Sequence, residues 1–188
     1  LKRKDAFLKA HLTDWTIGTH HIFWREGRST RHRRMYGGDL LDELSHPREL
    51  ARLIHWQFRP DPKQEGEAAG WHLPTFDDSA WVRATCLGFW EQQGFKDYDG
   101  HAWYRCQVEA PPEWQEHQKI ILRFGAVDES FRLYVDGKLI AESIYDAAHD
   151  PDLWKKPREV DVSAALRAGQ RHLLAVDVLD TAGAGGLW

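Results

Sequence analysis

The chain has 188 residues, of which 42% are hydrophobic and 29% charged, and its formal net charge is −4. This length suits one full domain with a sizeable core and an appended segment, but hardly two domains. The slightly acidic balance argues against a nucleic-acid partner, because nucleic-acid-binding surfaces are normally basic. No apolar run of roughly 18 residues occurs, so we expect no transmembrane helix and no membrane partner.

Residues 1–52 differ from the rest of the chain in their residue pattern, which is helix-like and locally basic. Leucines at roughly helical spacing predict a helix over 38–53, and a shorter helix is expected over 5–12. Between them lies a basic patch, which we interpret as a solvated face rather than an anion site: Arg25, Arg28, Arg31, Arg33 and Arg34. We therefore expect a partly helical N-terminal extension. Because the chain begins without Met and ends abruptly at Trp188, we also expect it to be a piece of a longer protein.

From residue 53 onward the pattern is almost entirely that of β-strands. Apolar and polar residues alternate with a period of two, which is typical of strands with one buried face. Asp136-Gly137 separates two such runs and predicts a hairpin with a type I′ turn. Ser163 is expected to cap a single helical turn. The predicted strands span residues 54–59, 103–108, 119–124, 131–135, 138–142, 159–162 and 172–179.

Aromatic residues are dense between Gly70 and Arg105, in a chain with ten tryptophans. Broken by Gly, Pro and Asp, such a stretch favours an antiparallel β-sandwich. We expect Trp71 and Trp81 to lie in the core, with the neighbouring aspartates forming an Asx-type turn. Arg105 is expected to form an ion pair inside the sandwich, with Asp128 or Glu129.

Six motifs occur in an order that resembles the N-terminal sugar-binding domain of glycoside hydrolase family 2 enzymes. They read W-x-F-x-x-DP, GW-x-x-P-x-FDDSAW, FWEQQG, YDGHAWYR, VDESFRLYVDGK and VDVSAALRAGQRHLLAVDVLDTAGAGG, and they lie between Trp56 and Gly186. The resemblance implies an all-β, antiparallel jelly-roll of the galactose-binding-domain-like class over residues 53–188. The family does not account for residues 1–52.

In that family a separate catalytic barrel supplies both catalytic carboxylates, and such a barrel takes about 250 residues. The resemblance therefore implies a non-catalytic carbohydrate-binding module of a larger glycan-degrading enzyme. Its partners would be an oligo- or polysaccharide and the catalytic domain of the parent chain. The alternative is a structural scaffold that packs against the barrel without binding sugar. We expect a secreted or periplasmic location in a bacterium.

Candidate sugar-binding residues lie in loops, where a sandwich displays ligand sites. Aromatic rings would stack on sugar faces, while carboxylates and histidines would bond hydroxyl groups. For Trp154 the alternative is that its ring closes one end of the sandwich. The candidates are Trp90, Glu91, Tyr98, Asp99, His101, Asp128, Tyr145, His149 and Trp154.

The eleven histidines show no zinc-ligand spacing with cysteines, and no phosphate loop or serine nucleophile elbow is present. We therefore expect no cofactor. A single structural Ca2+ remains an alternative, since galactose-binding-like sandwiches often carry one. The two cysteines, Cys86 and Cys106, could bridge neighbouring strands, but we expect free thiols.

Overall fold

The computed structural model describes residues 51–86, 88–112, 114 and 119–188. The described part is built from eight strands and two short 3-10 helices, η2 (Trp90–Gln93) and η4 (Leu153–Lys155). The strands are β1 (His55–Asp61), β2 (Val82–Thr85), β3 (Gly100–Ala110), β4 (Ile121–Phe124), β5 (Ser130–Val135), β6 (Lys138–Ser143), β7 (Arg158–Asp161) and β8 (Gln170–Asp180).

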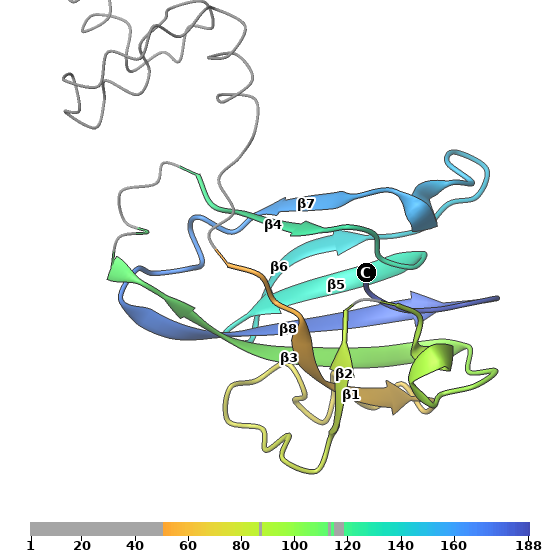
Figure 1. The fold of residues 1–188 in the computed structure, drawn as a ribbon, viewed down its shortest axis with the longest axis horizontal. Coiled ribbons are helices and arrows are strands. Elements are labelled where there is room, and N and C mark those ends of the chain that lie inside the picture. Colours follow the sequence, from red (N-terminus) through yellow and green to blue (C-terminus); the bar gives the residue numbers. More distant parts are fainter. Residues whose placement is uncertain (1–50, 87, 113, 115–118) are drawn as a thin grey trace, which may run out of the picture. The chain divides into compact units, whose positions relative to one another are not determined.

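All strand pairings are antiparallel. A six-stranded sheet has the order β2-β1-β3-β8-β5-β6, and β4 pairs with β7 in a second, two-stranded sheet. The long strands β3 and β8 run along the middle of the larger sheet (Figure 1), paired from Gly100↔Asp180 to Ala110↔Gln170. Phe124 of β4 meets Phe131 of β5 edge-on, with ring centroids 5.8 Å apart, and so packs the second sheet against the first. The predicted all-β antiparallel sandwich is confirmed.

The strands coincide closely with those predicted, except that β2 was not foreseen. Its four residues bury only Ala84, so the sequence carries little alternation there. The turn between β5 and β6 is confirmed: Asp136 and Gly137 have φ values of 49° and 85°, as a type I′ turn requires. The cap assigned to Ser163 is wrong. Its hydroxyl accepts from the Ile120 amide, while its own amide donates to Asp161.

Both faces of the large sheet are covered by side chains. Trp103 packs edge-on against Trp71 and stacks on Tyr134, with centroids 6.3 and 5.7 Å apart. Its neighbour Tyr104 points to the opposite face, where it meets Trp56 and Phe58. Four consecutive residues of β3, at positions 102–105, are therefore buried, so this part of the strand has no exposed side.

Arg105 organises the loop that links β1 to β2. Its Nε donates to the Asp78 carboxylate at 2.6 Å, and its other nitrogens donate to the carbonyls of Trp71, Leu73 and Phe76. The expectation of a partner at Asp128 or Glu129 is therefore wrong. Asp78 lies in the loop between β1 and β2, 27 residues before Arg105, and no spacing in the sequence indicates that contact.

Three further predictions concern the N-terminal extension, the cysteines and membrane-spanning helices. The predicted helices and basic patch before residue 51 lie outside the described residues, so they remain predictions. Both cysteines are free thiols, as expected. Within the described part of the chain, no helix has the length and apolar character needed to cross a membrane.

Candidate functional site

Five acidic residues converge at one end of the large sheet, and we refer to them as the acidic cluster. The strand register brings them together, because Asp180 ends β8 where it pairs with Gly100 at the start of β3, while Ser130 at the start of β5 pairs with Leu179. The residues just before β3 and β5 must therefore lie beside the end of β8. The members are Glu91, Asp99, Asp128, Glu129 and Asp180.

The last residues of the chain hold the cluster in place. Leu187 forms a β-bridge with Val127, and the amide of Asp128 donates to the Gly186 carbonyl at 3.1 Å. The amide of Gly185 donates to Glu91 Oε1, also at 3.1 Å. A Cβ at Gly185 would lie 2.6 Å from Asp180 Oδ2, so only glycine permits this close approach. Two of the five carboxylates are thus packed against backbone.

Three carboxylate oxygens of the cluster are buried without a hydrogen-bond donor: Glu91 Oε2, Asp128 Oδ2 and Asp180 Oδ2. Asp128 is only 4% exposed and Asp180 is fully buried. Asp180 Oδ1, by contrast, accepts from the amide of Ala182 at 2.8 Å. Buried polar atoms are nearly always paired, so these acceptors call for donors, which can be a proton held by the carboxyls themselves or groups of a ligand.

The pKa values of Asp128 and Asp180 are both raised. Burial, followed by the neighbouring Asp180 carboxylate, raises the pKa of Asp128 from 3.8 to about 8. Burial also raises the pKa of Asp180, and the charges of Asp99 and Glu129 add to this effect. Because two adjacent buried carboxyls cannot both ionise cheaply, we infer that Asp128 and Asp180 share a proton at neutral pH.

Glu91, Asp99 and Asp128 are the predicted site residues that the structure brings together. Glu129 and Asp180 complete the cluster but were not among the predicted site residues. The signal for Asp180 was weak: a single Asp where the last strand meets a loop of small residues. Only the antiparallel register places that Asp beside Asp128.

The prediction that Trp90 stacks on a sugar is wrong. Its ring is 1% exposed and is enclosed by Phe58 and Tyr98, with centroids 6.0 and 5.6 Å away. Its Nε1 donates to the Tyr98 carbonyl at 3.0 Å. Trp90 therefore packs in the core and offers no free face to a ligand.

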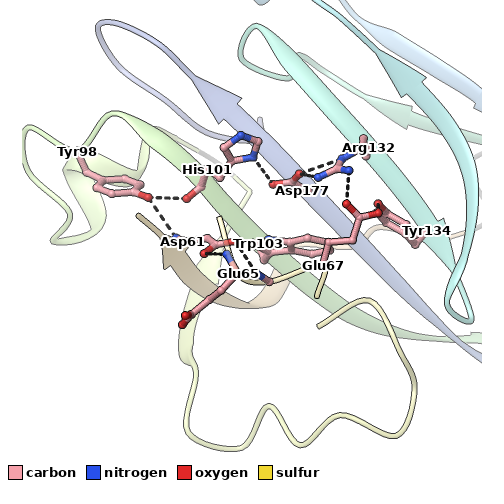
Figure 2. Close-up of polar contacts among 10 residues, drawn as sticks. Asp61, Glu65, Glu67, Tyr98, His101, Trp103, Arg132, Tyr134 and Asp177 are labelled. Atoms are coloured by element: carbon pink, nitrogen blue, oxygen red, sulfur yellow. Dashed lines mark hydrogen bonds and ion pairs between the residues drawn. The ribbon is translucent and has the colours of Figure 1, made fainter. Parts of the chain in front are cut away.

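Tyr98 and His101 belong to a polar network that runs across the sheet (Figure 2). The Tyr98 hydroxyl donates to the His101 carbonyl at 2.5 Å and accepts from the amide of Asp61 at 3.1 Å. The His101 Nδ1 lies 2.9 Å from the buried Asp177 carboxylate, and this hydrogen bond raises the pKa of His101. The Tyr98 hydroxyl and His101 Nδ1 are thus engaged within the chain, and a sugar contact by either residue stays a prediction.

The network continues through Arg132, which donates to Asp177 at 2.7 Å and to Glu67 at 2.6 Å. Glu67 also accepts from the Tyr134 hydroxyl at 3.1 Å. The buried Asp61 carboxylate accepts from the amides of Glu65 and Gly66 and from Trp103 Nε1. These bonds tie the loop after β1 to the sheet, so we assign the network a structural role.

Tyr145, His149 and Trp154 lie in the loop between β6 and β7. The Tyr145 amide donates to the Ser130 hydroxyl at 2.8 Å, so the loop leaves the sheet at the same end as the acidic cluster. The Tyr145 hydroxyl donates to the Pro151 carbonyl at 3.0 Å, and His149 pairs with Asp146 at the surface. Trp154 is 37% exposed, with the Lys155 amine 5.6 Å from its ring centroid. Stacking on Trp154 therefore stays a prediction.

Within the described residues, no group of three or more His, Cys, Asp or Glu side chains is arranged to hold a metal ion. A structural Ca2+ stays an untested alternative.

Comparison with known proteins identifies the family. Residues 67–185 match the model described as "Glycosyl hydrolases family 2, sugar binding domain". A β-glucuronidase of Streptococcus agalactiae serotype V is 40% identical over 47 residues, which cover 25% of this chain and 8% of that protein. The chain therefore spans only a small part of that relative's length.

Solved structures give the same result. A β-glucuronidase of Ruminococcus gnavus superimposes with a TM-score of 0.56 at 25% identity, covering 67% of this chain and 20% of that one. A structure of b-glucuronidase from the same organism in complex with D-glucuronic acid has a TM-score of 0.57 at 22% identity, covering 71% and 23%. The latter supports the fold alone. The chain belongs to the sugar-binding domain family of the family 2 glycosyl hydrolases, as its motifs predict.

Proposed function

We propose that this domain takes part in carbohydrate recognition in a glycoside hydrolase, through the acidic cluster, and is not itself catalytic. The observation that carries the proposal is the set of three buried carboxylate oxygens, at Glu91, Asp128 and Asp180, for which the described residues offer no donor except the proton that the two aspartates share. Sugar hydroxyls are hydrogen-bond donors of the kind these acceptors lack. Asp99 is exposed and Glu129 is half-buried, and they offer outer acceptors to the same ligand.

Access to the inner carboxylates requires a movement of the loop 181–184, which is exposed and wraps Asp180. The amide of Thr181 donates to Glu129 Oε2 at 2.8 Å, and that of Ala182 donates to Asp180 Oδ1. Two hydrogen bonds therefore hold the loop closed. A hydroxyl entering the cluster stabilises the ionised carboxylates, so the shared proton is released when the sugar binds.

Proton release gives the proposal a sharp test. Titration calorimetry of the 188-residue chain with neutral mono- and oligosaccharides, repeated in buffers of different ionisation enthalpy, should reveal a proton released per site. Asp180→Asn should abolish both binding and release, whereas Asp97→Asn, at a residue 84% exposed, should change neither. Binding without proton release, or binding that survives Asp180→Asn, would refute a role for the cluster.

The second candidate is a scaffold domain that packs against the catalytic domain of the parent chain. It is supported by exposed apolar side chains, notably Val82 on the edge strand β2 (51%) and Ile144 after β6 (73%). Absence of sugar binding in the calorimetry, together with improved solubility of Val82→Thr and Ile144→Thr, would favour this function. The proposal also includes a parent enzyme that degrades glycans and a secreted or periplasmic location in a bacterium.

A further inference from the structure

The described part of the chain buries two arginines, and their surroundings differ sharply. Arg105, 2% exposed, has Asp78 and three backbone carbonyls as partners. Arg158, 9% exposed, stands at the start of β7, and its Nε and Nη2 are buried without any hydrogen-bond partner. A guanidinium is always charged in proteins, so burying it without an anion is costly.

The two unpaired nitrogens belong to one edge of the guanidinium. Nε–H and one Nη2–H point in parallel and together match the two oxygens of a carboxylate. We propose that Arg158 is a binding site for a carboxylate, supplied by an acidic sugar or by a small organic acid. The site is distinct from the acidic cluster and does not depend on the function proposed for it.

Within the described residues, no carboxylate is hydrogen-bonded to Nε or Nη2 of Arg158. Asp150 is the acidic residue whose charge acts on Arg158, but its two carboxylate oxygens both accept from the Lys156 amine at 2.7 Å. Burial lowers the pKa of Arg158, as expected for a cation without a close counter-ion. On β4, Phe124 pairs with Arg158 in the strand register and provides no acceptor side chain.

Access to Arg158 runs through the loop before β7. Its ion pairs, Lys156–Asp150 and Lys155–Asp152, join partly exposed side chains and contribute little to stability. These two ion pairs therefore offer little resistance to a movement of the loop. Trp154, in the same loop, is 37% exposed and offers a ring face to a sugar that carries the carboxylate.

Thermal unfolding of the 188-residue chain tests the site. Sodium glucuronate, sodium acetate and glucose are compared with sodium chloride at equal ionic strength. A carboxylate present at roughly ten times its Kd should raise the Tm of the wild type by about 3–6 °C. Arg158→Met should show no such shift, and in chloride it should melt no lower than the wild type, because it removes a buried unpaired charge.

Two further variants keep the test decisive. Arg123→Met, on the partner strand and 58% exposed, should retain the full shift. Arg158→Lys keeps the charge but lacks the fork, so its shift should be smaller, and it serves if Arg158→Met fails to fold. Equal Tm shifts with acetate and glucuronate would show that the site binds the carboxylate and makes no contact with the sugar ring. A larger shift with glucuronate that Trp154→Ala removes would show that the sugar ring is bound too.

Equal carboxylate shifts in the wild type and Arg158→Met would overturn the proposal. So would the absence of a shift in both proteins, which would assign the counter-ion of Arg158 to another part of a larger protein.

Discussion

Replacing Asp128 by Asn should stabilise the domain at alkaline pH while changing little at acidic pH. Asn has the same size, keeps the acceptor oxygen and supplies N–H donors to the neighbouring Asp180 carboxylate. In the wild type the pKa of Asp128 is raised to about 8, chiefly by burial. A raised folded-state pKa contributes stability that is fully present below the unfolded value of 3.8 and is lost as pH rises through 8.

The magnitude follows from this pKa. A rise from 3.8 to about 8 corresponds to at most about 6 kcal/mol of stability lost between pH 4 and pH 9. Relaxation and coupling to Asp180 reduce this, because buried sites respond with an effective dielectric well above that of dry protein. We therefore expect Asp128→Asn to exceed the wild type by about 2–3 kcal/mol at pH 9.

Urea unfolding at pH 5, 7 and 9 measures the effect as the difference between variant and wild type, in which the titration of groups that do not interact with Asp128 cancels. Asp97→Asn, at an exposed position with positive φ that Asn also tolerates, is the matched control and should show no pH-dependent difference. A difference between Asp128→Asn and the wild type that stays constant from pH 5 to pH 9 would refute the inference that Asp128 is protonated at neutral pH.

Three other predictions concern packing and the polar network. Arg105→Met should lower the free energy of unfolding, measured by urea titration, by about 3–5 kcal/mol, because it leaves Asp78 and three carbonyls without their donor. The control is Arg171→Met, at a side chain 67% exposed, which should lower it by less than about 0.5 kcal/mol. Trp90→Ala should cost about 3–5 kcal/mol and Trp154→Ala under about 1 kcal/mol; similar losses would contradict their assigned burial. His101 has a raised pKa, so its stabilising contact with Asp177 is complete below about pH 6.5 and weakens as pH rises. The difference in unfolding free energy between the wild type and His101→Gln should therefore shrink from pH 6 to pH 9. A difference that grows over this range would contradict the raised pKa.

Local patterns were enough to predict the strands and the family. Alternation in β5, the Asp136-Gly137 turn and the order of the aromatic motifs each depend on residues close together in the chain. Trp71 and Trp81 were likewise placed correctly in the core, because the turn that carries them is local. The short strand β2 was missed, since an edge strand with a single buried residue has almost no periodicity.

The site depended on contacts that sequence spacing does not encode. Trp90 and Trp154 look alike as loop aromatics, yet one is a core residue and the other is exposed, because only the packed sheet decides which ring is covered. Asp180 joins Asp128 through strand register, and Arg105 finds Asp78 through a loop folded back across β3. The local sequence patterns were thus enough to establish the sandwich and its family. Tertiary structure decided which carboxylates and which arginine were left without partners, because pairing depends on distances across strands that lie far apart in the chain.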